Sequence, residues 1–329
     1  MGRRKCGIRG IHAEAIGSDI VAYNQRSMDS GINKPWIDQL RRAERLPASY
    51  TGMALEYVAP LAERVQALRR YLDRPVVVGV NGAQGSGKST LALFLANWLE
   101  REQGLSTASL SLDDLYLDKP AREHLASRHH PLLRTRGVPG THDVALGIKI
   151  LDELTEQGPG RVVRLPVFDK ATDDLLKQAE WRRFDGPVDV VLFEGWCIAA
   201  QPQSNEFLDS PVNSLEANDD PDRVWRTFVN EKLNSDYAEL FKWIDALIML
   251  RIPSFDNVFA WRELQERKQR ADSGISADEL RHFIMHFERL TRHMLEYMPD
   301  YANTVIDIDD THNMVGMTHS NWPCGGAFS

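Results

Sequence analysis

The chain has 329 residues, of which 43% are hydrophobic and 26% charged, and its formal net charge at pH 7 is -8. This composition is ordinary for a soluble globular protein and supplies enough apolar residues for one large α/β domain or two small ones. The acidic balance argues against a nucleic-acid-binding protein, which usually carries a basic face, but it leaves room for a local basic pocket.

The three cysteines, Cys6, Cys197 and Cys324, are far apart and show no CxxC spacing. They predict neither a disulfide framework nor a structural zinc site, and they favour a reducing, cytoplasmic location. No run approaches about 18 consecutive apolar residues, so we expect no transmembrane helix and no membrane partner.

The N-terminal part of the chain divides into two segments. Residues 1–34 show no sustained periodicity, and we expect a disordered tail there. Over 35–74 the pattern is helical, with apolar residues three or four apart, as at Tyr57, Leu61 and Val65. Such a stripe is typical of an amphipathic helix. We therefore predict a helical extension that packs on the core.

Residues 75–314 form the predicted catalytic domain, in which strands alternate with helices. The strand-like runs are Pro75–Val80, Thr107–Leu112, Val162–Leu165, Val188–Phe193, Ala246–Ile252 and Thr304–Ile308, and the helical patterns are 89–103, 144–156, 222–242, 256–272 and 277–298. This alternation predicts a mostly parallel sheet with helices on both faces, a three-layer α/β/α sandwich. Residues 200–221 are polar, as in a surface excursion, and 315–329 are expected to be a disordered C-terminal tail.

The clearest motif is GAQGSGKS, which satisfies the P-loop pattern G-x-x-x-x-G-K-[ST]. A buried-type strand precedes it and an amphipathic helix follows it, so that glycine-rich backbone and the helix N-terminus can surround phosphate oxygens. We predict that it binds the triphosphate of ATP with Mg²⁺, with Lys88 on the β- and γ-phosphates and the Ser89 hydroxyl on the metal. The predicted nucleotide-binding residues are Gly82, Ala83, Gln84, Gly85, Ser86, Gly87, Lys88, Ser89 and Thr90.

Two predicted strand ends supply carboxylates. SLDDLY (Ser111–Tyr116) follows the second strand, and VDVVLFEGW (Val188–Trp196) has the shape of a Walker B strand. Ligand-binding residues of open α/β sheets lie at the carboxyl ends of strands. Asp113 is therefore expected near the acceptor hydroxyl, and Glu194 is expected either to hold Mg²⁺ through a water or to orient the acceptor. The alternatives are a helix N-cap for Asp113 or Asp114 and a solvated strand-end carboxylate for Glu194.

A third polar segment is TRGVPGTHD, which contains Arg136, His142 and Asp143 around a flexible Val-Pro-Gly stretch. Such a loop can surround a small polyhydroxylated anion, because Arg supplies fork-shaped donors for a carboxylate and Asp accepts hydrogen bonds from hydroxyls. An ordinary turn is the alternative.

Two further charged segments complete the candidates. In VFDK (Val167–Lys170), Asp169 and Lys170 either face the pocket or form a surface pair. The predicted helix that contains WRELQERKQR is either a solvated face or a lid whose arginines neutralise charge on the transferring phosphoryl group, with Arg262 as first choice and Arg267 as second.

Taken in chain order after GAQGSGKST, the motifs SLDDLYL, TRGVPGTHD, VFDK, VVLFEGWCIA and WRELQE resemble the D-glycerate 3-kinase family of plants, fungi and bacteria. The resemblance runs from about Pro75 to Asp310. That family is similar in fold to the uridine kinase, phosphoribulokinase and pantothenate kinase group of P-loop kinases. The resemblance implies phosphorylation of a hydroxyl of D-glycerate by ATP with Mg²⁺, which gives 3-phosphoglycerate and ADP.

The resemblance also implies roles for single residues. Asp113 matches the aspartate that uridine kinases use as base in an S-x-D-x-F-Y pattern, of which Ser111 and Tyr116 also match while Leu115 replaces the aromatic residue. The segment 136–143 matches the family's Arg-Gly-x-x-Gly-x-His-Asp stretch. Together, the patterns and the resemblance predict Lys88, Asp113 and Arg262 as catalytic, Ser89 and Glu194 at the metal, and Asp113, Tyr116, Arg136, His142, Asp143, Asp169 and Lys170 at the substrate.

Two other functions stay open. One is a P-loop kinase of the same fold that acts on another hydroxyl substrate, such as a nucleoside, pantothenate or a sugar. The other is an ATP-binding regulatory protein without metabolite kinase activity. A GTPase is expected to show an N-K-x-D motif, whereas the Asn33-Lys34 pair lies upstream of the loop and is followed by Pro35. The expected partner is a small hydroxy acid rather than nucleic acid, and the sequence makes no prediction of oligomeric state.

Overall fold

The computed structural model describes residues 34–156, 158, 160–269, 277–320, 322 and 323, with the side chains of 263–269 left out. Structural statements below refer to this part of the chain. The predicted N-terminal tail lies outside it, apart from Lys34. The chain divides into two compact units, Met1–Glu56 and Tyr57–Ser329.

The described part of the first unit is helical. It contains α2 (Pro35–Ala43) and α3 (Tyr50–Met53), and a π-helical turn (Ala54–Val58) crosses the boundary to the second unit. Proline is favourable in the first turn of a helix, and the Arg41 guanidinium pairs with the Asp38 carboxylate at 2.8 Å, three residues away. The predicted packing of this extension on the core stays a prediction.

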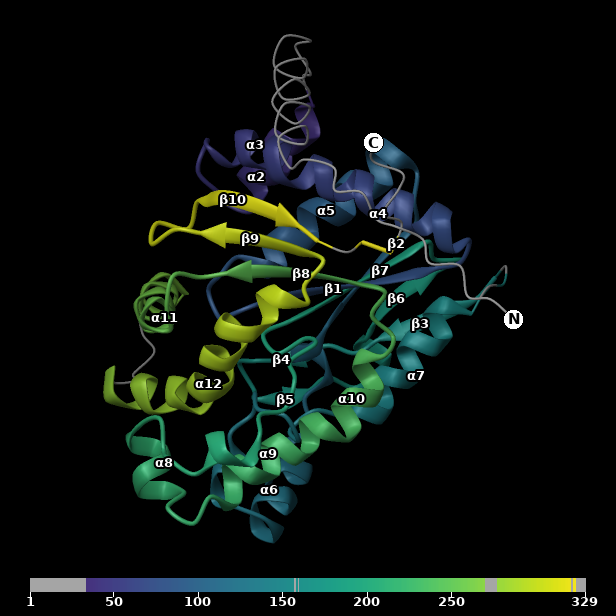
Figure 1. Cartoon of the computed structure of the whole chain (residues 1–329). Helices are drawn as coiled ribbons and strands as arrows, with labels where there is room; N and C mark the ends of the chain where they lie inside the picture. Colours follow the sequence, from purple (N-terminus) through teal and green to yellow (C-terminus); the bar gives the residue numbers. More distant parts are fainter. Residues whose placement is uncertain (1–33, 157, 159, 270–276, 321, 324–329) are drawn as a thin grey trace, which may run out of the picture. The chain divides into compact units, whose positions relative to one another are not determined.

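The second unit is built on a six-stranded sheet in the order β10-β9-β8-β1-β7-β2 (Figure 1). Its strands are β1 (Val76–Gly82), β2 (Thr107–Ser111), β7 (Val190–Gly195), β8 (Ala246–Arg251), β9 (Thr304–Ile308) and β10 (Met314–His319). Strands β1, β2, β7, β8 and β9 run parallel to one another, and β10 runs antiparallel to β9. The carboxyl ends of five strands therefore meet at one edge of the sheet.

Helices cover both faces of this sheet. The α-helices of the second unit, within the described residues, are α4 (Ala59–Leu72), α5 (Lys88–Gln103), α6 (Lys119–Arg128), α7 (Val144–Thr155), α8 (Ser214–Asp219), α9 (Val224–Asn234), α10 (Asp236–Phe241), α11 (Asp256–Gln269) and α12 (Ala277–Tyr297). On one face α4 and α5 pack on β1, and on the other α7, α10 and α12 share a core with the strands (Figure 1). The predicted three-layer α/β/α fold is confirmed.

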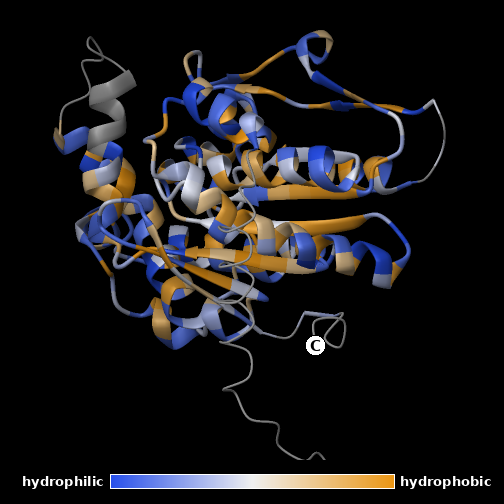
Figure 2. Ribbon diagram, turned by 90° about the horizontal axis from the view of Figure 1, so that it is seen from above, coloured by the Kyte–Doolittle hydropathy of each residue, from blue (hydrophilic) through white to orange (hydrophobic). Residues whose placement is uncertain are grey.

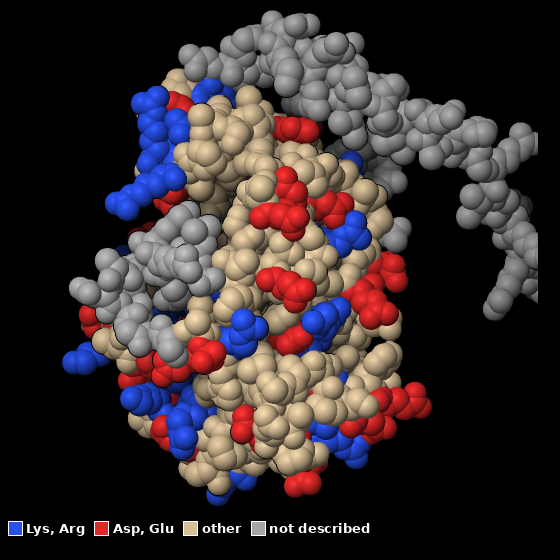
Figure 3. Space-filling view, turned by 90° about the vertical axis from the view of Figure 1, so that its left-hand side faces the viewer, with Lys and Arg blue, Asp and Glu red and all other residues tan. Residues whose placement is uncertain are grey.

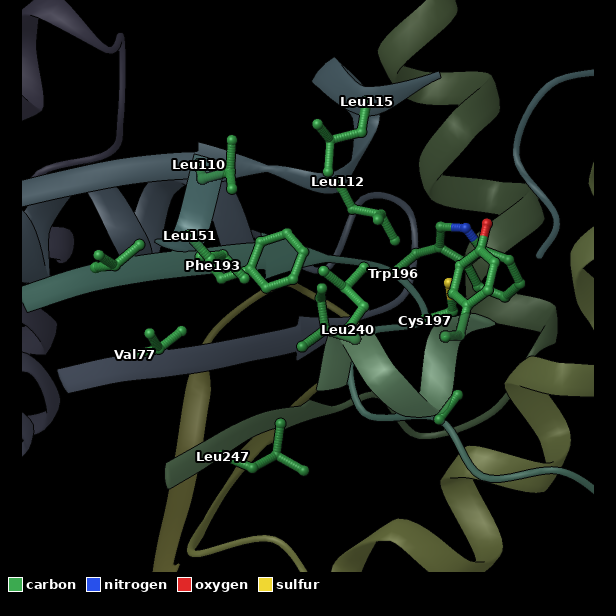
Figure 4. Close-up of a cluster of buried hydrophobic side chains, with 14 of the residues drawn as sticks. Val77, Leu110, Leu112, Leu115, Leu151, Phe193, Trp196, Cys197, Leu240 and Leu247 are labelled. Carbon is green, nitrogen blue, oxygen red and sulfur yellow. The ribbon is translucent and has the colours of Figure 1, made fainter. Parts of the chain in front are cut away.

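Burial explains why the central strands were recognisable. Every residue of β1 is buried, as expected for a parallel strand with helices on both faces, and the central strands are largely hydrophobic in Figure 2. On the α7 face, apolar side chains from four strands meet side chains of α7 and α10 (Figure 4). Among the labelled residues, Val77, Leu110, Phe193 and Leu247 come from the strands, and Leu151 and Leu240 come from the helices.

Two antiparallel pairs lie outside the main sheet. β3 (Val162–Leu165) pairs with β6 (Arg182–Asp185), and β4 (Phe168–Asp169) pairs with β5 (Asp174–Leu175). The strand at β3 was correctly predicted but not its place, because a fully parallel arrangement would have put it in the main sheet. Alternate residues of β3 are exposed, which suits a strand with one face in water rather than a strand between two helical layers.

The C-terminal tail that we predicted for 315–329 is wrong over residues 315–319, which form β10. This strand pairs with β9 through its backbone, and its segment is also held by a hydrogen bond from Trp322 Nε1 to Thr304 Oγ1 at 3.1 Å. An edge strand needs few apolar side chains, so the segment lacks a strong pattern.

The predicted helix over 222–242 is interrupted at Ser235, where α9 ends and α10 begins.

The polar segment 200–221 was predicted as a surface excursion, and its second half differs from that prediction. Glu216 and Asp220 are each 1% exposed. Glu216 pairs with Arg289 of α12 at 2.6 Å, and Asp220 pairs with Arg226 of α9 at 2.9 Å. Buried carboxylates of this kind need paired cations, so these residues fix the segment to two helices.

None of the described helices combines the length and apolar character needed to cross a bilayer. Over most of the face in Figure 3, acidic and basic side chains are interspersed among uncharged residues.

Candidate active site

The phosphate loop lies between β1 and α5 at the carboxyl edge of the sheet. Gly85 and Gly87 have φ angles of 82° and 89°, in the left-handed region that favours glycine. Lys88 and Ser89 are the first two residues of α5, where the helix dipole and unpaired backbone N–H groups attract anions. The local backbone therefore has the conformation of the predicted phosphate loop, and the assignment of its residues to the nucleotide stays a prediction.

Glu194 is the last residue but one of β7 and lies beside this loop. In the sheet it lies level with Val80 of β1 and Ser111 of β2. It is only 8% exposed, so it is not a solvated strand-end carboxylate. Its Oε1 atom accepts a hydrogen bond from the Ser89 hydroxyl at 3.1 Å, and its buried Oε2 atom has no hydrogen-bond partner among the described residues.

The residues at this point fit a magnesium ion that binds together with a nucleotide. A hydroxyl and a carboxylate are oxygen ligands of the kind that Mg²⁺ takes, and Mg²⁺ usually uses only one or two protein groups beside waters and substrate phosphates. Within the described residues, no group of three or more His, Cys, Asp or Glu side chains could hold a metal by itself. The orphaned Oε2 of Glu194 is consistent with such a shared site.

Asp113 follows β2, in a 3-10 turn over Leu112–Leu115. Its side chain does not cap this turn, because the Ser111 hydroxyl does so by accepting from the Asp113 backbone N–H at 3.3 Å. Instead, its Oδ1 accepts from the Tyr116 hydroxyl at 2.8 Å and its Oδ2 from the Lys170 ammonium at 2.7 Å. Burial acts to raise the pKa of Asp113, but the charges of Lys170 and Lys88 outweigh it and hold the pKa well below its usual value. Asp113 is therefore an ionised carboxylate within reach of two cations.

Asp114, the neighbouring carboxylate, has a different environment. Its Oδ1 accepts from the Phe168 backbone N–H and its Oδ2 pairs with Arg182, both at 3.1 Å. Burial raises the pKa of Asp114 above its usual value. These contacts attach β4 and β6 to the end of β2, so the two adjacent aspartates have separate structural environments.

The β4–β5 hairpin, residues 168–175, lies over Asp113. Both Arg122 and Arg136 pair with Asp173 at the tip of the hairpin, the former at 2.9 Å. The Arg136 guanidinium also lies 5.5 Å from the centroid of the Phe168 ring, within cation–π range. Since two cations share one carboxylate, these three side chains together carry one more positive than negative charge.

Asp169 and Lys170 stand next to each other in the hairpin but point to different partners. Asp169 accepts hydrogen bonds from the Ala171 backbone N–H at 2.9 Å and the Thr172 hydroxyl at 2.7 Å, and so closes the turn. Lys170 reaches Asp113, while its side chain stays 60% exposed. The structure thus brings Lys170 to the site, whereas the contacts of Asp169 are within its own turn.

His142 is brought to the site by an isolated β-bridge with Tyr116. The two rings are stacked, with centroids 4.6 Å apart. Burial lowers the pKa of His142 to about 3, and its Nε2 atom has no hydrogen-bond partner among the described residues. The next residue, Asp143, accepts from the Leu146 N–H at 2.9 Å and caps α7, so its predicted contact with substrate stays a prediction.

The predicted lid arginine, Arg262, lies in α11. This helix is close to the phosphate loop, since a Cβ atom built on Gly85 would lie 3.0 Å from Cβ of Trp261. Arg262 follows Trp261 directly, which places it near the loop, but its lid role stays a prediction. The side chain of Arg267 lies outside the described part of the chain.

Sequence reasoning missed three side chains that shape the site. Arg122 and Asp173 fasten the hairpin, and the Tyr237 hydroxyl lies 2.5 Å from His142 Nδ1. Tyr237 is 95 residues from His142 in the chain and falls on a helix without a motif, so nothing in the local pattern signals the pair.

No family model matches this chain, but single relatives match most of its length. An uncharacterized kinase of Schizosaccharomyces pombe (mug58) is 34% identical over 239 residues, covering 70% of this chain and 80% of the relative. The chloroplastic D-glycerate 3-kinase of Arabidopsis thaliana is 29% identical over 222 residues, covering 65% of this chain. The match spans 46% of that longer relative.

A solved structure agrees with these relatives. The D-glycerate 3-kinase of Cryptococcus neoformans var. grubii superposes with a TM-score of 0.67 at 27% identity, covering 80% of this chain and 99% of that one. The parallel sheet, the phosphate loop and the relatives lead to one conclusion. The chain belongs to the D-glycerate 3-kinase-like family of P-loop kinases, and it is a phosphotransferase with an alcohol group as acceptor.

Proposed function

We propose that this kinase transfers the γ-phosphate of ATP, bound with Mg²⁺, to a hydroxyl of D-glycerate, giving 3-phosphoglycerate and ADP. The observation that carries the proposal is the position of Asp113. This ionised carboxylate pairs with the exposed Lys170 and is also stabilised by the charge of Lys88 in the phosphate loop. An acceptor hydroxyl beside Asp113 would face a phosphate held at Lys88. Two relatives that resemble the chain are themselves D-glycerate 3-kinases.

The proposed transfer is an in-line displacement. The acceptor oxygen forms a bond to the γ-phosphorus, the bond from that phosphorus to the β,γ-bridging oxygen breaks, and the hydroxyl proton passes to Asp113. The low pKa of Asp113 makes it a weak base. This suits phosphoryl transfer, because the loose transition state depends on positioning and charge stabilisation more than on early proton removal.

The charges beside Asp113 favour an anionic acceptor over a neutral one. Lys170 is exposed enough to turn from Asp113 towards a substrate carboxylate, and the Arg122–Arg136–Asp173 cluster has one more cation than anion. A hydroxy acid offers both groups that this site can use, a hydroxyl for Asp113 and a carboxylate for the cations. A nucleoside or a neutral sugar offers only the first.

The remaining predicted residues take supporting roles in this proposal. The loop residues from Gly82 to Thr90 surround the phosphates, and Ser89 and Glu194 hold Mg²⁺, which neutralises phosphate charge when bound. Arg262 serves as the lid arginine. If Arg262→Ala changes turnover by less than about twofold, which corresponds to roughly 0.4 kcal/mol, Arg262 does not have this role.

An acceptor panel tests the substrate. ADP formation is followed in a coupled assay with D-glycerate, L-glycerate, pantothenate, uridine and a hexose, and the product is identified by ³¹P NMR. We expect stimulation by D-glycerate and a new phosphomonoester signal. No stimulation by D-glycerate, with turnover of another acceptor, would overturn the substrate and keep the kinase.

A pair of matched variants tests the base. Asp113→Asn should lower kcat by at least about 100-fold, within the range of a general base, while ATP binding stays intact. Asp118→Asn is the control. Within the described residues the Asp118 side chain caps α6 by accepting from Ala121 N–H, and asparagine caps helices equally well. If both variants turn over alike, Asp113 is not the base.

A further inference from the structure

The ring of His142 lies between the rings of two tyrosines, one of which contacts Asp113. On one side it stacks on Tyr116, whose hydroxyl donates to Asp113 at 2.8 Å. On the other side the ring of Tyr237 meets it edge-on, with centroids 5.7 Å apart. Both His142 and Tyr237 are buried, at 4% and 0% exposure. The imidazole is thus held one ring away from the proposed base.

The hydrogen bonds of Tyr237 determine which nitrogen of His142 can carry a proton. The Gly140 backbone N–H donates to the Tyr237 hydroxyl at 3.0 Å, and a backbone N–H cannot act as an acceptor. The hydroxyl has one proton of its own. The His142 backbone N–H is a second donor beside this hydroxyl. The acceptor that the described residues place there is His142 Nδ1 at 2.5 Å. The Tyr237 proton is therefore donated to Nδ1, which must accept.

A neutral imidazole that accepts at Nδ1 carries its proton on Nε2. Burial lowers the pKa of His142 to about 3, so the ring is neutral near pH 7. Its Nε2–H group is buried and without a partner among the described residues. A buried donor left unpaired destabilises the fold, and a ligand oxygen at this position would satisfy it.

We propose that Tyr237 is a positioning residue that fixes His142 as the neutral Nε2–H tautomer, so that His142 donates a hydrogen bond to an oxygen of the acceptor substrate. The identity of this acceptor rests on the proposed function, whereas the tautomer does not. A neutral donor suits this position, because Lys88 and Lys170 already supply positive charge around Asp113. The hydrogen bond from His142 would orient the acceptor without adding further positive charge to the site.

The tautomer can be measured without any substrate. In protein labelled with ¹⁵N-histidine, long-range ¹H–¹⁵N correlations distinguish the protonated ring nitrogen from the bare one. Comparison with His142→Gln assigns His142 among the ten histidines. We expect a neutral ring protonated at Nε2 at pH 7. A ring protonated at Nδ1 would overturn the proposal, even if D-glycerate is not the acceptor.

Kinetics then test what the tautomer does. Tyr237→Phe should raise KM for the acceptor about tenfold, while KM for ATP changes less than twofold. The control is Tyr301→Phe. The Tyr301 hydroxyl donates a partly buried hydrogen bond to the backbone, at Ala199 O, but lies outside the site. An unchanged acceptor KM in Tyr237→Phe would overturn the positioning role.

A second pair of variants keeps the test decisive if Tyr237→Phe does not fold. The side-chain amide of glutamine lies near the position of Nε2, and that of asparagine near Nδ1. His142→Gln should therefore keep the acceptor KM within about threefold of wild type, while His142→Asn raises it by tenfold or more. The reverse order would show that donation comes from Nδ1 and would overturn the proposal.

Discussion

His142 is expected to make the stability of this protein fall as the solution becomes acidic. Burial lowers its pKa from 6.5 to about 3 in the folded chain. Below pH 6.5 the unfolded chain therefore takes up a proton that the folded chain does not, and this favours unfolding. The contribution of His142 is complete above pH 6.5 and is lost progressively as the pH falls from 6.5 towards 3.

The magnitude follows from the two pKa values. One pKa unit corresponds to about 1.4 kcal/mol. At pH 5 the unfolded imidazole is almost fully protonated while the folded one is almost fully neutral, so lowering the pH from 7 to 5 should cost about 2 kcal/mol through His142 alone. This is a large share of the roughly 5–15 kcal/mol that stabilises a typical domain.

Urea unfolding, followed by tryptophan fluorescence at pH 7 and pH 5, measures this cost. Wild type is compared with His142→Gln, which cannot titrate. Burial also lowers the pKa values of His286 and His319, both to about 4, but these residues are present in both proteins and their effects cancel. Wild type should lose about 2 kcal/mol more than the variant between the two pH values. Equal losses would show that His142 is not buried as a neutral ring, and would refute the reasoning.

Three other predictions concern the phosphate loop, the metal and the packing around the site. Lys88→Ala should abolish turnover with every acceptor in the coupled assay while circular dichroism stays unchanged, and full phosphoryl transfer by this variant would exclude the loop as the donor site. Glu194→Gln should raise the Mg²⁺ concentration for half-maximal activity by about 10- to 100-fold, and an unchanged Mg²⁺ titration would remove Glu194 from the metal. Gly137→Ala places a Cβ atom 2.4 Å from Phe287 Cε1 at a φ of +132°, and should lower the free energy of unfolding by about 2–4 kcal/mol. Adding Phe287→Leu should restore part of that loss in urea unfolding, and no recovery would show that this contact is not its cause.

The nucleotide half of the site could be predicted because its chemistry is local in sequence. Strand, loop and helix follow one another within Val76–Gln103, and the glycine spacing alone fixes the turn. Asp113 and Glu194 could be placed for a related reason, since the carboxyl ends of parallel strands meet at one edge of the sheet. The D-glycerate 3-kinase-like family could be identified because these motifs keep their order.

The rest depends on partners that are distant in the chain. Nothing in the Asp-Asp pair shows that Asp113 meets Lys170 while Asp114 holds Arg182, because these partners lie 57 and 68 residues further on. The tautomer of His142 depends on Tyr237, and Glu216 read as a surface acid because its partner is 73 residues away in α12. The sequence shows the charge and shape of each side chain, whereas its interaction partner depends on the fold.

The β4–β5 hairpin over Asp113 also has a consequence for how such kinases diversify. It is fastened to the end of β2 through Asp114 and to the body of the domain through Arg122 and Arg136, and among the described residues none of its hydrogen bonds or ion pairs involves the phosphate loop. In the proposed function, Lys170 of the hairpin and the phosphate loop thus belong to separate stretches of the chain. Exchange of this one short cassette between members of the family should move the preference for an acceptor and leave the affinity for ATP where it was.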